Sequence, residues 1–189
     1  MASSVALILA KGSSNRLPDK NKLEFKGIPM FLHNVYKCLN IFSRVYVSSD
    51  DNFILGIAED VGAIPIKRGE ELCGDTPNIP VYRHAAETMN GFDYLVAIQA
   101  NSPTIDSLLI FRAKQLMEKC KLNELMTCDE NYKIYGSIWA LSRKRLNDYK
   151  DFYNPKPDIL LLDNSIDIHT IDDFNKALNQ WKQNQVKYW

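Results

Sequence analysis

The chain has 189 residues, the size of one domain that can bury its own core without disulfides or a structural metal. Its 23 Lys and Arg residues balance 23 Asp and Glu residues, which argues against general attraction to nucleic acid or to an anionic membrane surface. No stretch approaches the roughly 20 apolar residues of a membrane span, and the four cysteines form no C-x-x-C pair. We therefore expect a single cytoplasmic domain over residues 1–189, with reduced thiols and with any phosphate recognition confined to a local site.

Apolar runs and helical periodicities alternate along the chain. The first run, at 5–10, is continuous rather than alternating, which is typical of a strand covered on both faces in a parallel sheet. The expected elements then follow in the order helix 30–39, strand 44–48, helix 51–61, strand 63–66, helix 79–89, strand 94–99, helix 105–119, strands 125–127, 136–141 and 158–162, and a helix from 171. This alternation predicts a three-layer α/β/α domain, Rossmann-like, with a mostly parallel sheet.

A fold of this class binds its ligands at the carboxyl ends of its strands. The loops after Ala10, after Gln99 and after the strand that ends near Leu162 are therefore the expected places for a site. The last of these loops ends at Thr170, which forms with Asp173 an acidic variant of the capping box. We expect the final helix to begin there.

The loop after the first strand is polar and rich in cations. It reads K-G-S-S-N-R-L-P-D-K-N-K over residues 11–22 and contains neither the Walker pattern nor the three glycines of a dinucleotide fingerprint. Its small residues let backbone N–H groups approach an anion, and its four cations can offset a triphosphate with about four negative charges: Lys11, Arg16, Lys20 and Lys22. The loop therefore predicts a phosphate site; the alternative is a solvated turn whose cations only face water.

From Ala10 to Asn21 this loop resembles the opening motif of the CMP-sugar acid synthetases. It reads A-K-G-S-S-N-R-L-P-D-K-N, where the sialic acid synthetases carry A-R-G-G-S-K-G-I-P-x-K-N and the KDO synthetases carry A-R-x-x-S-T-R-L-P-x-K. Lys11 stands where both groups have Arg, which keeps the charge but not the bidentate fork. The resemblance implies catalytic roles for Arg16 and Lys20, and nucleotide contacts by Ala10, Lys11, Gly12, Ser13, Ser14, Arg16, Lys20 and Asn21.

Further segments match the same family in the same order along the chain. Residues 67–76 read K-R-G-E-E-L-C-G-D-T and are similar to R-P-x-x-L-x-x-D-T-A, residues 98–103 read I-Q-A-N-S-P and resemble L-Q-P-T-S-P, and residues 135–139 read Y-G-S-I-W and resemble N-G-A-I-Y. The resemblance implies a nucleotide or acceptor contact by Arg68, a nucleotide contact by Asp75, and acceptor contacts by Gln99, Asn101 and Ser102. It also implies the nucleotide-diphospho-sugar transferase type of the expected fold.

The segment at 165–174 reads S-I-D-I-H-T-I-D-D-F and resembles the family's S-I-D-I-D-T-x-x-D-L, in which the two carboxylates of D-I-D hold magnesium. His169 replaces the second of these aspartates, and Asn101 stands where the KDO enzymes have an aspartate on the metal. The resemblance implies that Asp167 is a catalytic metal ligand, with His169 as the second ligand. The cofactor is then Mg²⁺, which prefers oxygen ligands, or Mn²⁺ or Co²⁺ if the imidazole binds.

Each of these assignments has a structural alternative. Arg68 can instead pair with a neighbouring surface glutamate, and Asp75 can cap the helix that follows. Gln99 can be a satisfied strand-end residue, Asp167 can orient the final turn, and His169 can make a structural hydrogen bond.

Only residues 128–134 lie between Thr127 and Tyr135, where these synthetases usually insert a longer excursion that forms their dimer and reaches into the partner's site. We therefore expect a monomer, or a dimer unlike the family's usual one. The short connection also removes contacts to a long sugar side chain, so a transferase that uses a smaller acceptor is an alternative.

The resemblance as a whole implies a cytidylyltransferase that moves CMP from CTP to an acidic sugar, which is a sialic acid-like sugar, a related nonulosonic acid or KDO, and releases pyrophosphate. The acceptor's anomeric hydroxyl would attack the α-phosphorus in line, a reaction that depends mainly on positioning and charge neutralisation. One alternative is a transferase with another base, such as a molybdenum-cofactor-type guanylyltransferase. The other is a nucleotide-binding relative that no longer catalyses, which His169 and Asn101 would suit.

Overall fold

The structure is a computed structural model that describes residues 2–74, 76–150 and 153–186, with side chains described as far as Trp181. Its helices and strands follow one another in the order β1 (Ser4–Leu9), β2 (Glu24–Phe25), β3 (Ile28–Pro29), α1 (Met30–Leu39), β4 (Val45–Ser49), α2 (Asn52–Asp60), β5 (Ile64–Lys67), a 3₁₀-helix (Glu70–Leu72), α3 (Asn78–Thr88), β6 (Tyr94–Gln99), α4 (Ser107–Cys120), β7 (Glu124–Cys128), β8 (Ile134–Ser142), α5 (Arg143–Asp148), β9 (Ile159–Leu162) and α6 (Ile171–Val186). Every helix and strand expected from the sequence is present, with small shifts at the ends.

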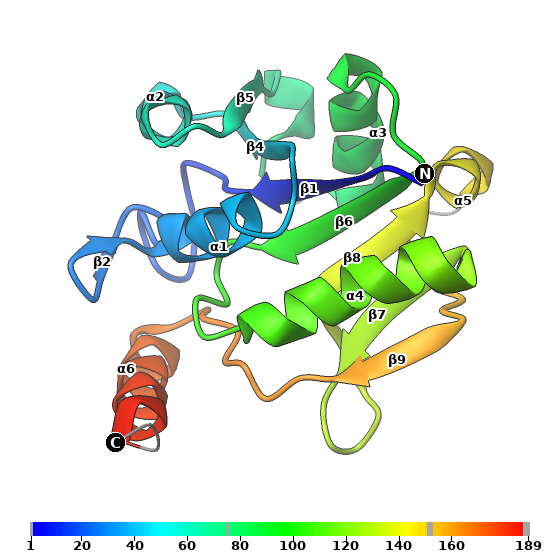
Figure 1. Ribbon diagram of the computed structural model, residues 1–189. Coiled ribbons are helices and arrows are strands. Elements are labelled where there is room, and N and C mark those ends of the chain that lie inside the picture. The colour runs from blue at the N-terminus through cyan, green and yellow to red at the C-terminus, as the bar shows by residue number, and fades with distance from the viewer. Residues whose placement is uncertain (1, 75, 151–152, 187–189) are drawn as a thin grey trace.

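Within the described residues, seven strands form one sheet in the order β5-β4-β1-β6-β8-β7-β9 (Figure 1). Strand β1 lies inside the sheet and is parallel to both of its neighbours, β4 and β6. Strand β8 runs antiparallel to β6 and to β7, whereas β9 is again parallel to β7. The predicted mostly parallel sheet is therefore confirmed. Because its parallel strands end at the same edge, the loops that follow them come together there.

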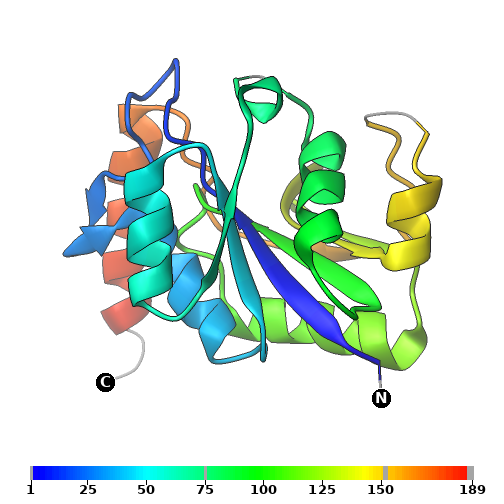
Figure 2. The same cartoon turned by 90° about the horizontal axis from the view of Figure 1, so that it is seen from above.

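Helices cover both faces of the sheet, which confirms the three predicted layers (Figure 2). Helices α1, α2 and α4 pack on one face, whereas α3 and α5 pack on the other. Along β1, Ala6 and Ile8 belong to the first of these cores, and Val5 and Leu7 belong to the second. The run at 5–10 is continuously apolar because successive side chains are buried on opposite faces.

The last helix packs against a small hairpin rather than against the sheet. Phe25, in the hairpin β2–β3, makes edge-to-face contacts with Phe174 at 5.5 Å and Trp181 at 5.8 Å between ring centroids. Phe25, Ile168 and Ala177 are fully buried in this third apolar cluster. The contacts hold the segment before α6 beside the loop after β1. The sequence did not predict the hairpin or α5, because elements this short are below the length at which periodicity is visible.

The N-terminus of α6 confirms the predicted capping box. Asp173 Oδ2 accepts hydrogen bonds from the backbone N–H of Thr170 at 2.9 Å and of His169 at 3.1 Å, and the Asp173 N–H donates to Thr170 Oγ at 3.2 Å. These bonds fix the backbone that carries His169 at the edge of the sheet.

The four cysteines all fall within the described residues and are free. In the same part of the chain, no helix has both the length and the apolar character that crossing a bilayer demands.

Candidate active site

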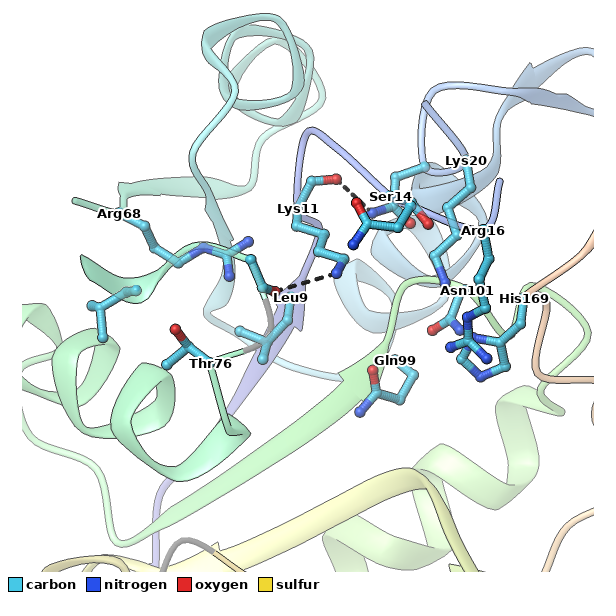
Figure 3. A pocket seen from close by; sticks show the side chains of 14 residues that line it. Leu9, Lys11, Ser14, Arg16, Lys20, Arg68, Thr76, Gln99, Asn101 and His169 are labelled. Carbon is cyan, nitrogen blue, oxygen red and sulfur yellow. Dashed lines mark hydrogen bonds between the residues drawn. The ribbon is translucent and has the colours of Figure 1, made fainter. Parts of the chain in front are cut away.

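The loops at the carboxyl ends of β1, β5 and β6 enclose a cavity of about 450 Å³, a volume within the range that small-molecule sites occupy (Figure 3). The segment between β9 and α6 closes one side of it. The lining residues are Leu9, Lys11, Ser14, Asn15, Arg16, Lys20, Asn21, Arg68, Leu72, Gly74, Thr76, Gln99, Asn101 and His169. The cavity therefore lies where the strand order predicted a site, after Ala10, after Gln99 and in the segment that follows Leu162.

Lys20 is a buried cation of this cavity. Its side chain is only 8% exposed, and Nζ donates a hydrogen bond to the Ile168 carbonyl at 3.0 Å. The pKa of Lys20 is lowered to about 8, chiefly by burial; Asp167 opposes this shift, and the nearby charges of Lys11 and Arg16 add to it. A bound polyanion would favour the charged form of this lysine and would replace the solvation that it lacks.

Cations lie on both sides of the cavity. Figure 3 shows Arg68 on one side and Lys20 with Arg16 on the other, with Lys11 between them. Lys11 Nζ donates to the Gly74 carbonyl at 3.3 Å, which brings this lysine toward the segment after β5. An anion of the length of a triphosphate could contact both sides at once.

Lys22, the fourth cation of the loop, does not line the cavity. It pairs with Asp19 at 2.8 Å and with Asp51 at 2.9 Å, and these hydrogen bonds raise its pKa. The expectation that Lys22 offsets a triphosphate is therefore corrected, because its ammonium group already has two carboxylate partners.

Arg68 has the strongest signature of a ligand contact. It follows β5 directly, is 6% exposed, and lies with Nη2 3.6 Å from Asp50 Oδ1. Its Nε and Nη2 make no hydrogen bond with any described residue, although both are buried. Burial lowers the pKa of Arg68, which Asp50 partly offsets. The structure thus shows Arg68 beside Asp50 and not in a surface pair with a neighbouring glutamate, and its Nε and Nη2 remain available as hydrogen-bond donors to a bound anion.

Asp50 is a site residue that the sequence did not single out. It comes directly after β4, and besides facing Arg68 its Oδ1 accepts the backbone N–H of Gly12 at 2.9 Å. One carboxylate thus holds both the phosphate loop and the arginine across from it. The available signal was its position, a polar residue at the carboxyl end of a buried strand.

Gly12 is needed because the loop passes close to Asp51 at this position. It does not offer a free backbone donor, since its N–H already donates to Asp50 Oδ1. A Cβ at this position would lie 2.6 Å from Asp51 Cβ, and Asp51 caps α2 by accepting the Phe53 N–H at 2.8 Å. Gly12 thus has a structural role in addition to its predicted nucleotide contact.

Gly12→Ala is expected to destabilise the protein by about 1–3 kcal/mol, because the added methyl group must displace Asp51 and weaken the cap of α2. Urea unfolding measures the change. The matched control is Gly56→Ala, within α2, where a Cβ meets nothing within 4 Å. That variant should gain about 0.5–1 kcal/mol from helix propensity. Equal stabilities of Gly12→Ala and the wild type would contradict this reading of the loop.

A chain of hydrogen bonds joins Arg16, His169, Asp167 and Asn101. Arg16 Nη2 donates to His169 Nδ1 at 2.6 Å, and His169 Nε2 lies 2.7 Å from Asp167 Oδ2. Because arginine can only donate, Nδ1 must accept, and the ring proton of the neutral imidazole lies on Nε2. Asn101 Nδ2 donates to Asp167 Oδ1 and, at 3.2 Å, to the Ile168 carbonyl. His169 thus makes the hydrogen bonds of its structural alternative, and its role as a metal ligand stays a prediction.

The described residues near Asp167 could bind a divalent cation only together with ligands from outside the protein, such as phosphate oxygens and water. Among the described residues, no group of three or more His, Cys, Asp and Glu side chains is placed to enclose an ion. Both ring nitrogens of His169 are hydrogen-bonded, so this residue could ligate a metal only by losing a partner. Asp167, which accepts a hydrogen bond from the amide nitrogen of Asn101, offers carboxylate oxygens to a hard cation that phosphate oxygens and water would also ligate.

Other predicted site residues lie elsewhere. Ala10 is buried and its N–H donates to the Ser48 carbonyl at 3.1 Å, Ser13 is exposed beside the cavity lining, and Ser102 is fully buried behind it. Their side chains are not among the lining residues, so direct contacts from them are not supported by this arrangement. Asp75 lies outside the described residues.

Asn21 and Gln99 are both brought to the cavity. Asn21 Nδ2 donates to the Lys11 carbonyl at 2.8 Å and so fixes the turn of the loop, while its buried Oδ1 has no partner among the described residues. Gln99 ends β6 and lines this cavity as well as a second, smaller one. Sequence reasoning missed the lining residues Leu9, Asn15, Leu72, Gly74 and Thr76. All but Leu9 lie inside the segments 11–22 and 67–76 that it did single out.

Comparisons with known proteins show which family the chain resembles. The family model described as cytidylyltransferase matches residues 5–154. The chain is 30% identical to the pseudaminic acid cytidylyltransferase of Campylobacter jejuni subsp. jejuni (serotype O:2) over 64% of this chain and 54% of that protein, so the match spans about half of its length. It is 26% identical to the CMP-N,N′-diacetyllegionaminic acid synthase of Legionella pneumophila over 90% of this chain and 92% of that one.

Solved structures show the same fold at low identity. A CMP:2-keto-3-deoxy-manno-octonic acid synthetase complexed with CTP superposes with a TM-score of 0.80 at 16% identity, over 97% of this chain and 100% of that one. Rv0371c from Mycobacterium tuberculosis, in complex with manganese, superposes with a TM-score of 0.70 at 11% identity, over 94% of this chain and 99% of that one.

Proposed function

The chain belongs to the cytidylyltransferase family, and from this premise we propose that it transfers CMP from CTP to a hydroxyl group of an acidic sugar and releases pyrophosphate. The sugar is a sialic acid-like sugar, a related nonulosonic acid or KDO, the acceptors that the names of the relatives describe. The observation that carries the proposal is the cavity itself. Cations from two segments converge on it, and one of them, Arg68, has a buried Nε and Nη2 that make no hydrogen bond with any described residue.

The reaction requires that the phosphate charge be neutralised and that the two reactants be correctly positioned. An acceptor hydroxyl oxygen forms a bond to the α-phosphorus of CTP, the bond from that phosphorus to the bridging oxygen breaks, pyrophosphate leaves, and the hydroxyl proton passes to solvent. Negative charge develops on the phosphate oxygens, so cations that the fold holds in place around them are the main source of rate. In this proposal Lys11, Arg16 and Lys20 bind the triphosphate, and Arg68 holds the nucleotide from the opposite side.

A divalent cation completes the proposal. Mg²⁺ or Mn²⁺ would be held by Asp167, with Asn101 beside it and phosphate oxygens supplying further ligands, and it would neutralise phosphate charge. The same fold in a manganese complex supports a divalent ion. His169 then orients both Asp167 and Arg16 through its two ring nitrogens instead of binding the metal itself.

The test is pyrophosphate release from CTP, with the other nucleoside triphosphates as controls, against sialic, legionaminic and pseudaminic acids and KDO, with Mg²⁺ and with Mn²⁺. Release that requires CTP and one of these acids supports the proposal. Thermal stabilisation by CTP without release for any acceptor would identify a nucleotide-binding relative that no longer catalyses. Release with GTP instead of CTP would assign another base. The expected monomer, or unusual dimer, stays a prediction for light scattering.

Arg68→Met is expected to weaken CTP binding about 10- to 100-fold, because it removes a buried, charge-assisted contact while keeping the bulk of the side chain. Calorimetric titration with CTP measures the loss. Lys67→Met is the matched control, since Lys67 is exposed and its Nζ contacts the Asp50 carbonyl at 2.5 Å and Asn52 Oδ1 at 2.7 Å outside the cavity. Unchanged affinity in Arg68→Met would remove this arginine from the site.

A further inference from the structure

A second cavity adjoins the first one at Gln99. It measures about 260 Å³, and its floor and walls are formed mainly by Met126, Tyr135, Gly136, Trp139 and Tyr153. Among the described residues that line it there is no Lys, Arg, His, Asp or Glu. The two neighbouring cavities thus differ in chemistry, because the first is lined by cations, whereas the second is lined mainly by aromatic and apolar groups, with the uncharged amides of Asn78 and Gln99 beside them.

Two of the aromatic residues that line this second cavity, Trp139 and Tyr135, have their polar groups hydrogen-bonded to residues outside its lining. Trp139 Nε1 donates to Glu124 Oε1 at 2.8 Å, and the Tyr135 hydroxyl donates to the Ser165 carbonyl at 2.6 Å. Both partners belong to other parts of the sheet edge. Since these groups are already hydrogen-bonded, the two rings offer the cavity apolar surface and no free donor.

The cavity exists because the pairing of β7 with β8 is irregular. Met126 pairs with Trp139, but Cys128, two positions on, pairs with Ile134, five positions back, so β8 bulges out here. Gly136 lies in the bulge at a φ of 71°, a conformation that other residues rarely adopt, and a Cβ there would point toward Met126 Cε at 3.5 Å. Because Gly136 has no side chain, it leaves space beside Met126 at the floor of the second cavity.

Gln99 joins the two cavities and is the polar group at their boundary. Its backbone carbonyl accepts from Asn34 Nδ2 at 2.8 Å, whereas its side-chain amide makes no hydrogen bond with another described residue. An acceptor whose reacting hydroxyl faces the cations of the first cavity must extend its far end past Gln99. That end then enters the apolar cavity.

We propose that this second cavity binds the non-reacting end of the acceptor and selects sugar acids that end in a methyl group over those that end in a hydroxymethyl group. The inference rests on the proposed function and specifies its substrate. A methyl group packs against the aromatic faces, whereas a hydroxyl group against those faces would lose water without gaining a partner from Trp139 or Tyr135, whose polar groups are already hydrogen-bonded. The acid's carboxylate, next to the reacting carbon, remains among the cations of the first cavity.

The test uses N-acetylneuraminic acid and its 9-deoxy derivative, which differ by one oxygen atom at the far end. The wild-type chain is expected to show a kcat/KM about 10- to 100-fold higher for the 9-deoxy acid. Tyr153→Ala should reduce this preference several-fold and leave the KM for CTP unchanged, because Tyr153 is 64% exposed and its loss does not disturb the core. Tyr132→Ala, at an equally exposed tyrosine outside the cavity lining, should keep the wild-type preference.

A second readout separates this proposal from the function on which it rests. Both acids are titrated calorimetrically onto the wild-type chain in the presence of a CTP analogue with a methylene group between the α- and β-phosphorus atoms. Tighter binding of the 9-deoxy acid without any pyrophosphate release from CTP would support the cavity and overturn the transferase. Turnover of both acids at equal kcat/KM, or an unchanged preference in Tyr153→Ala, would overturn the cavity and leave the transferase. Neither turnover nor binding would overturn both.

Discussion

Lys20→Met is expected to lower kcat/KM for CTP about 100- to 1,000-fold, because a preorganised buried cation is lost from the place where phosphate charge develops. Steady-state pyrophosphate release measures the effect. The fold should be retained or slightly stabilised, since burial disfavours the charged ammonium group and methionine fills the same space without that cost. Thermal unfolding of the variant checks this part.

Lys22→Met is the matched control for Lys20→Met. Lys22 lies two positions further along the same loop but pairs with Asp19 and Asp51 outside the cavity. Its loss should change kcat/KM less than threefold. Equal effects of the two substitutions would show that the loop contributes general charge rather than one positioned cation.

The affinity for CTP should also depend on pH through the charge of Lys20. With the pKa of Lys20 lowered to about 8, the free protein loses this cation as the pH rises through that value, so affinity for CTP should fall between pH 7 and pH 9. The bound triphosphate raises the pKa again, which keeps the loss partial. Lys20→Arg should flatten the profile, because a guanidinium group stays charged in this range.

Asp167→Asn is expected to lower kcat about 100- to 1,000-fold with a change of less than threefold in the dissociation constant of CTP. The Asp167 carboxylate lies near the cations that are proposed to bind the triphosphate. Its oxygens receive hydrogen bonds from Asn101 and His169. An amide of the same shape keeps the size of the side chain but loses the charge that a metal ion requires. Single-turnover rates with and without added Mn²⁺ measure the loss of the metal dependence.

Asp172→Asn is the control for Asp167→Asn. Asp172 is an exposed residue in the first turn of α6, whereas Asp167 is hydrogen-bonded to two residues that line the cavity, Asn101 and His169. Wild-type turnover in that variant, with a large loss in Asp167→Asn, would locate the effect at the proposed metal site. Full activity of Asp167→Asn would reject a metal role for this carboxylate and favour the alternative that it only orients the turn before α6.

The sequence by itself determined the fold class and the edge of the sheet at which the site lies. The apolar run at 5–10 and the alternation of strands and helices are local properties of the chain, and they predicted β1, α1 and β6 within a residue at either end. The phosphate loop was visible because its glycine, serines and cations are consecutive. Very short elements were not visible, since the hairpin β2–β3 and α5 contain too few residues to show a period.

Only the tertiary structure decided which charges face the ligand. Lys20 and Lys22 are equivalent in the sequence pattern, and they differ because Asp19 and Asp51 attract one of them while packing near Ile168 buries the other. In the same way, the roles of His169 and Arg68 depend on partners far away in the chain. Such contacts follow from how the loops meet at one edge of the sheet, and neither periodicity nor spacing along the chain encodes that meeting.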